Sequence, residues 1–261
     1  GSHTLTINQD TTFKLTAEYP GGSLARYVTV YLNNLSVDIQ SPYDGQILTN
    51  SHVTVNGVYT GPKSSAITVN GHEALVKDGM FILPNLPLKQ GENELEITLR
   101  TISGLSTKKV VYVNSDAESS VLFAGVAPSE GLAPFTGQLQ LEYLGKEGLS
   151  EVRVDFNDDG MFDYIGPLIK DIPFTFDTSG FYNVLVEADD KVGIKHTTMT
   201  TVVVRTQSEV EDHFNVVFDQ FKSSLINGDK NNSMNFILAS KHDQYGPILE
   251  ALMPHMNEIL E

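Results

Sequence analysis

The densest group of side chains that could do chemistry is a short acidic loop in the second half of the chain. Its oxygen ligands would be Asp155, Asn157, Asp159, Met161 through its carbonyl, and Asp163. The first three occupy alternate positions, as ligands do in loops that hold calcium, and Gly160 permits the sharp turn. This spacing predicts a calcium site that stabilises a hairpin rather than performing a reaction.

The same loop also fits a tight hairpin turn without a metal. Asn-Asp and Asp-Gly pairs are common turn formers, and the position of the bidentate glutamate in an EF-hand loop is occupied here by Gly166. Both interpretations stay open. A second acidic pair, Asp189-Asp190, follows a predicted strand and would add ligands if it reached the same end of the fold.

Signatures of the common enzyme classes are absent from the sequence. It has no Gly-x-Ser-x-Gly elbow, phosphate-binding Gly-rich loop or His-Glu-x-x-His helix. Its histidines show no paired metal spacing, and with no cysteine there is neither a disulfide nor a thiol nucleophile. We therefore expect a non-enzymatic protein with no catalytic residues and with calcium as its only cofactor. A carboxylate pair that meets only in the fold is the open alternative.

Composition narrows the class of partner. The 261 residues carry a formal net charge of -16, which opposes binding to nucleic acid and to anionic membranes. No apolar run is long enough to span a bilayer. The length allows two or three small domains.

Alternating apolar residues predict the elements that position the loop. In the first half of the chain they are Val53, Val55, Ile67, Val69, Leu95, Ile97 and Leu99. Asp-Gly and Asn-Gly pairs, including Asn56-Gly57 and Asn70-Gly71, separate these runs and favour hairpin turns. Short strands at this spacing indicate a β-sandwich.

Residues 37–114 carry a specific resemblance. The segments Val37–Gly45, Val53–Gly57, Ile67–Gly71 and Leu88–Leu99 resemble the bacterial immunoglobulin-like domains found beside the catalytic domain of glucodextranases. Such domains are usually accessory domains that accompany a functional domain. The resemblance implies a structural or interaction role.

Residues 118–206 resemble a PKD-type β-sandwich. The resemblance rests on Gly131–Thr136, Val152–Gly160 and Phe174–Asp190. Tyr182 stands where such sandwiches often place a corner tyrosine, so we expect it to pack with its hydroxyl bonded to the backbone. The two modules together predict a mainly β fold class with tandem immunoglobulin-like sandwiches.

The sequence before the first module is predicted to contain a tag remnant, a partial domain and a short linker. Residues 1–3 look like a tag remnant, and residues 4–33 resemble the last strands of another immunoglobulin-like domain. Those strands are either a remnant or an edge that completes a homodimer. The polar linkers at 33–36 and 114–120 are short, which predicts a semi-rigid rod of modules.

Residues 207–261 change to a helical period. Ser208 and Glu211 form a predicted capping box, after which Phe214, Phe218 and other apolar residues follow one helical face up to Asn227-Gly228. Further helices are predicted from Asp229 and around Pro247. The first helix also resembles the opening helix of domains of the nuclear-transport-factor type, which implies a ligand pocket beyond the helices.

Together these observations predict a secreted, periplasmic or surface-exposed region of a modular bacterial protein that spaces or presents other domains. Its expected partners are the other domains of a longer chain and a protein or glycan. The alternatives are a glycan-binding accessory region of a polysaccharide-degrading enzyme, which an exposed row of tyrosines would favour, and a truncated domain that binds a small ligand.

Overall fold

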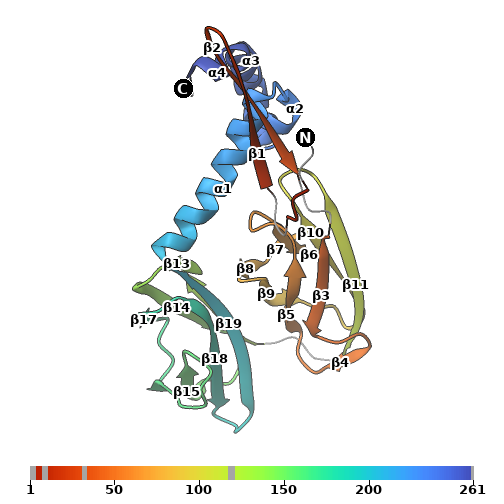
Figure 1. Cartoon of the computed structure of the whole chain (residues 1–261). Helices are drawn as coiled ribbons and strands as arrows, with labels where there is room; N and C mark the ends of the chain where they lie inside the picture. Colours follow the sequence, from red (N-terminus) through yellow and green to blue (C-terminus); the bar gives the residue numbers. More distant parts are fainter. Residues whose placement is uncertain (1–3, 8–10, 31–33, 117–120, 260–261) are drawn as a thin grey trace.

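The computed structural model describes residues 4–7, 11–30, 34–116 and 121–259. It is mainly β: two β-sandwiches, an N-terminal hairpin and a C-terminal helical segment (Figure 1). The tag remnant predicted at residues 1–3 lies outside the described residues. None of the described helices is both long and apolar enough to cross a membrane.

The first sandwich consists of a four-stranded sheet, in the order β3-β5-β9-β8, and a five-stranded sheet, in the order β4-β11-β10-β6-β7. Its strands are β3 (Ser36–Ser41), β4 (Gln46–Leu48), β5 (His52–Thr60), β6 (Ala66–Val69), β7 (His72–Glu73), β8 (Leu75–Lys77), β9 (Met80–Pro87), β10 (Gly91–Arg100) and β11 (Ser106–Ser115). All seven apolar residues predicted to face inward are buried in its core. The alternation in the sequence therefore identified the core correctly, because successive strand residues point to opposite faces.

Two Asn-Gly pairs that look alike in sequence have different structures. Asn70 and Gly71 both have positive φ, 50° and 82°, and form the predicted turn. Asn56-Gly57 was wrongly predicted as a turn, since it lies in the middle of β5. A Cβ at Gly57 would lie 2.1 Å from the carbonyl oxygen of Asp38 and 2.7 Å from the Phe81 ring, so glycine is needed there for close packing.

The second sandwich pairs a three-stranded sheet, β12-β14-β17, with a five-stranded sheet, β13-β19-β18-β15-β16. Its strands are β12 (Leu122–Ala127), β13 (Glu130–Leu132), β14 (Phe135–Tyr143), β15 (Leu149–Asp155), β16 (Tyr164–Gly166), β17 (Asp171–Phe176), β18 (Gly180–Asp190) and β19 (Lys195–Arg205). Tyr182 stacks on Phe176 at 3.7 Å between ring centroids. Its hydroxyl donates to the Thr178 carbonyl at 2.9 Å, as predicted for a corner tyrosine.

The N-cap of the first helix lies two residues before the predicted Ser208. The N-cap of α1 (Gln207–Ile226) is Thr206, and Glu209 completes the capping box. The helix ends at Asn227 and Gly228, as predicted. It is followed by α2 (Lys230–Met234), the short 3-10 helix Ala239–Lys241, α3 (His242–Leu252), the 3-10 helix Met253–His255 and α4 (Met256–Ile259).

The predicted apolar face of α1 is buried only near its C-terminal end. Leu225 packs in a small core with Leu249 and Met256, whereas Phe214 and Phe218 are 66% and 60% exposed. The first turns of α1 run between the second sandwich and the other helices (Figure 1).

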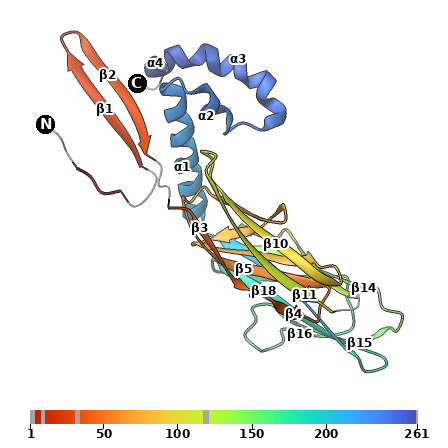
Figure 2. The same ribbon diagram turned by 90° about the vertical axis from the view of Figure 1, so that its right-hand side faces the viewer.

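The N-terminal strands form a separate hairpin, β1 (Thr11–Tyr19) and β2 (Gly22–Val30). Residues Thr4 to Ile7, which also carry a strand pattern, have no regular secondary structure. Tyr27 of β2 packs against the core of the helical segment. The N-terminal hairpin and the C-terminal helices therefore lie together above the sandwiches (Figures 1 and 2).

The two sandwiches lie side by side (Figure 1). The prediction of a semi-rigid rod of successive modules was wrong. Strand β9 of the first module contacts β19 of the second, and the Asn85 side chain donates to the Ala124 carbonyl at 3.0 Å. Arg205, at the end of β19, donates to the Val76 carbonyl at 2.6 Å. These contacts turn the second module back onto the first.

Candidate functional site

The acidic loop is organised by main-chain hydrogen bonds. Asp155, which is fully buried, accepts from the backbone amides of Asn157 at 3.2 Å, Asp159 at 3.3 Å and Gly160 at 2.8 Å. Asp163 accepts from the amide of Phe156 at 2.8 Å. The carboxylates thus satisfy the amides of a tight turn, which is how Asp favours such turns.

The remaining three predicted ligands belong to the same network. Asp159 accepts from the Met161 amide at 2.8 Å and from the Asn157 side chain at 3.1 Å. Among the described residues, no group of three or more acidic or histidine side chains is arranged to hold a metal ion. Calcium binding at this loop stays a prediction of the sequence.

The acidic pair Asp189-Asp190 lies at the other end of the sandwich. Strands β15 and β18 are antiparallel, so that Asp155 pairs with Leu185 while Leu149 pairs with Asp190. Along the strand, Asp189 and Asp190 are therefore about 13 to 20 Å from Asp155. Asp189 instead contacts Arg153 at 2.7 Å, and this hydrogen bond lowers the pKa of Asp189.

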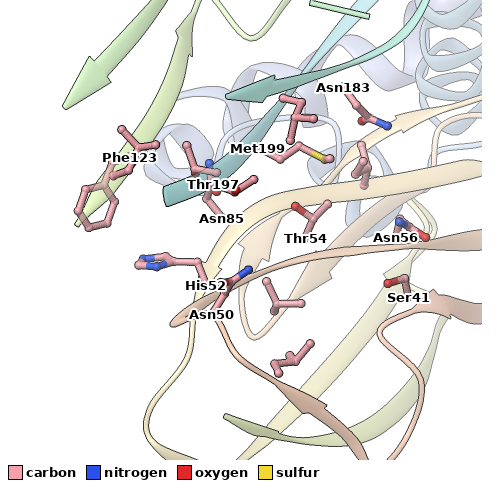
Figure 3. A pocket seen from close by; sticks show the side chains of 16 residues that line it. Ser41, Asn50, His52, Thr54, Asn56, Asn85, Phe123, Asn183, Thr197 and Met199 are labelled. Atoms are coloured by element: carbon pink, nitrogen blue, oxygen red, sulfur yellow. The ribbon is translucent and has the colours of Figure 1, made fainter. Parts of the chain in front are cut away.

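A cleft of about 440 Å³ lies between the two modules. Figure 3 shows side chains from both modules pointing toward one another across it. Its volume falls within the range of small-ligand sites in proteins, about 300–1,000 Å³. The cleft is thus the candidate functional site on grounds of size.

Strand β5 forms one wall of the cleft. Val53 and Val55 point into the core of the first module, and therefore His52, Thr54 and Asn56 point outward (Figure 3). The side chains of Thr54 and Asn56 make no hydrogen bond to any described residue. Strand β5 pairs with β9 on one side and, from Asn56 onward, with β3 on the other, and it presents its outward side chains to a ligand in the cleft.

The opposite wall comes from β18 and β19. Val184 and Val186 face the core of the second module, whereas Asn183 faces the cleft together with Thr197 and Met199 of β19 (Figure 3). The Asn183 side-chain oxygen accepts from Thr201 at 3.1 Å, which leaves its amide group free to donate. The Thr197 hydroxyl is exposed and unpaired within the described structure.

None of the described residues that line this cleft has an acidic or basic side chain other than one histidine. His52 and Phe123 meet edge to face at one end, with 5.4 Å between ring centroids. Burial lowers the pKa of His52 from 6.5, so the imidazole is neutral at pH 7. The polar groups that line the cleft are therefore uncharged, although 19% of the residues in the chain are charged.

Sequence reasoning did not select any of these cleft residues as a site. Asn56 was assigned to a turn, and His52 was treated as one of several scattered histidines. The available signal was the alternation from His52 to Gly57, in which polar residues separate valines. That pattern places the polar residues on one strand face, but the facing module cannot be inferred from it.

Among known proteins, the first module has a family match. Residues 34–117 match the sequence model described as Glucodextranase, domain B. None of the curated proteins is significantly similar to the chain.

Solved structures give distant similarities. The fibronectin(III)-like modules of CbhA from Clostridium thermocellum are 13% identical, with 66% of this chain and 94% of that chain covered and a TM-score of 0.25. Dimeric latent PorU from Porphyromonas gingivalis is 12% identical, with coverages of 66% and 20% and a TM-score of 0.35. SGBP-B of the Bacteroides ovatus mixed-linkage glucan utilization locus, solved with a mixed-linkage heptasaccharide, is 15% identical, with coverages of 65% and 47% and a TM-score of 0.22.

The paired sheets of each sandwich and the family match agree on the architecture. The chain contains tandem immunoglobulin-like modules, and the first of these is similar to domain B of glucodextranase.

Proposed function

We propose that this chain is a non-enzymatic structural and interaction region of a secreted or surface-exposed modular bacterial protein, and that it holds neighbouring domains in a fixed relative position. The similarity of the first module to an accessory domain supports this role. Support also comes from the way the two modules and the helical segment are joined.

One side chain carries the proposal. Glu209, in the first turn of α1, forms an ion pair with Lys77 of the first module. It also accepts from the Thr206 backbone amide at 2.7 Å, directly after β19 of the second module. Lys77 is only 7% exposed. A single, largely shielded contact therefore joins the first module, the end of the second and the start of α1.

The test measures whether the modules keep one relative position in solution. The chain has no cysteine, so Asn114→Cys on β11 and Gln140→Cys on β14 give one spin label on each module. We expect a single narrow distance distribution between these labels by pulsed electron resonance. Asn114→Cys with Glu73→Cys, both in the first module, provides the reference width.

A distribution much broader than that reference would show freely moving modules and refute the proposal. If the proposal holds, adding Glu209→Gln and Arg205→Ala to the labelled pair broadens the distribution, because two of the side-chain contacts that join the first module to the end of β19 and to α1 are removed.

A further inference from the structure

We infer that the cleft between the two modules binds a neutral glycan chain, held by the outward side chains of β5 and the facing side chains of β18 and β19. This binding role is additional to the positioning role proposed above and does not depend on it.

The first argument is the charge of the cleft. Moving an ion from water into a site without an opposite charge is costly. The described lining has no carboxylate, lysine or arginine, and its one imidazole is neutral at pH 7. The cleft therefore favours an uncharged ligand over an anionic or cationic one.

The second argument is the supply of hydrogen-bonding groups. Thr54, Asn56 and Thr197 bring amide and hydroxyl groups without a described partner into the cleft, and Asn183 keeps its amide donor. Each amide side chain combines donors with an acceptor, and each hydroxyl is both at once. A purely apolar ligand would leave these groups without partners, which is unfavourable. A polyhydroxylated ligand matches them.

The third argument concerns the apolar part of the lining. Phe123, Met199 and Leu185 lie among the polar groups. A sugar ring has C–H faces as well as hydroxyl edges, so one ring can contact both kinds of side chain. Aromatic and aliphatic surface with a few placed polar groups is the usual composition of a ligand site.

The strand arrangement argues against a peptide. An extended peptide commonly binds by adding a strand to a free sheet edge. Strand β5 pairs with β9 along the cleft and with β3 from Asn56 onward, and β19 pairs with β18, so that the faces of these strands and their alternate side chains line the cleft. The cleft therefore offers side chains, and a ligand rich in hydroxyl groups fits it better than a peptide backbone does.

The experiment uses four neutral polysaccharides, namely xylan, mannan, dextran and mixed-linkage β-glucan, with polygalacturonate as the anionic comparison. We expect at least one neutral polymer to retard the chain in affinity electrophoresis, and polygalacturonate to have no effect. For oligosaccharides of the retained polymer, calorimetry of Asn56→Ala is expected to show about tenfold weaker binding, since one hydrogen-bonding partner is lost.

Site assignment uses a pair of labelled cysteines. Thr197→Cys carrying a bulky maleimide fills the cleft and is expected to abolish binding. Asn114→Cys with the same label, at an exposed position of β11, leaves binding intact. Melting curves of both labelled proteins verify that each is folded.

Three results would overturn the inference. The first is that none of the four neutral polymers retards the chain. The second is that binding survives the label at Thr197→Cys, which would place the glycan site elsewhere. The third is that a soluble neutral peptide rich in Ser and Asn binds in the cleft while no polysaccharide does.

Discussion

At the scale of single residues, Asp155 organises the acidic loop. Its buried carboxylate accepts from three backbone amides, and hydrogen bonds to a charged acceptor are stronger than neutral ones. We expect Asp155→Asn to lower the free energy of unfolding by about 3 kcal/mol, because an amide side chain cannot accept all three bonds. Urea unfolding measures the change.

Asp158→Asn is the matched control for this prediction. Asp158 is exposed, and its φ of 56° suits asparagine equally well. If Asp158→Asn lowered the free energy of unfolding as much as Asp155→Asn does, the assigned role of Asp155 would be contradicted.

Calcium at the same loop is a separate prediction at this scale. If a cation binds Asp155, Asn157, Asp159, Met161 and Asp163, calcium raises the melting temperature relative to chelator, because binding to the folded state alone stabilises it. Asp159→Ala then removes the calcium effect. Identical melting curves with calcium and with chelator would show that the loop is a hydrogen-bonded turn without a calcium site.

At the scale of elements, the N-terminal hairpin has an apolar face that no described element covers. The register of β1 and β2 places Leu15, Leu24 and Val28 on one face, and these side chains are 58%, 45% and 46% exposed. Tyr27, on the other face, packs against the helical core. A homodimer through these strands would cover the exposed apolar face.

We expect Leu15→Lys with Val28→Lys to convert a dimer to a monomer in light scattering coupled to size exclusion, because two charges would be buried in the contact. Thr16→Lys, on the opposite face of the same hairpin, should leave the mass unchanged. A wild-type chain that is monomeric over a wide concentration range would disprove dimerisation.

At the scale of the whole molecule, the contact between Lys77 and Glu209 ties the modules to α1. Hydrogen bonding to Lys77 lowers the pKa of Glu209 below 4.5. The stability that the charged Glu209 contributes is therefore complete above pH 4.5. It is lost as the pH falls through the lower pKa that Glu209 has in the folded state. Burial opposes the charge on Lys77, but its bonds to Glu209 and Asp78 outweigh this and raise the Lys77 pKa.

Glu209→Gln is expected to lower the free energy of unfolding by about 2 kcal/mol at pH 7, since the buried Lys77 loses a charged partner. The difference from wild type shrinks as the pH falls below 4.5, which unfolding at a series of pH values will measure. Glu211→Gln, an exposed position on the same helix bonded to Gln207, is expected to change stability by less than about 0.5 kcal/mol. Equal effects of the two substitutions would contradict the prediction.

Local patterns predicted most of the strands and the end of α1. The burial of Val55 and Ile97 follows from alternation alone, and the hydroxyl bond of Tyr182 follows from its place in the sandwich. Asn56-Gly57 was misassigned because close packing of β3, β5 and Phe81 selects the glycine, and no local signal reports packing. Helical periodicity placed Phe214 on an apolar face of α1, but periodicity does not report which element, if any, covers that face.

The sequence by itself determined the mainly β class, the inward faces of the strands and the turns with positive φ, since these depend on neighbouring residues and on the two faces of a strand. Only the tertiary structure decided that the modules lie side by side, that Lys77 meets Glu209, and that Asn56 and Asn183 line one cleft. Those contacts join residues more than a hundred positions apart. Their geometry depends on the packing of whole modules, which no local pattern in the chain records.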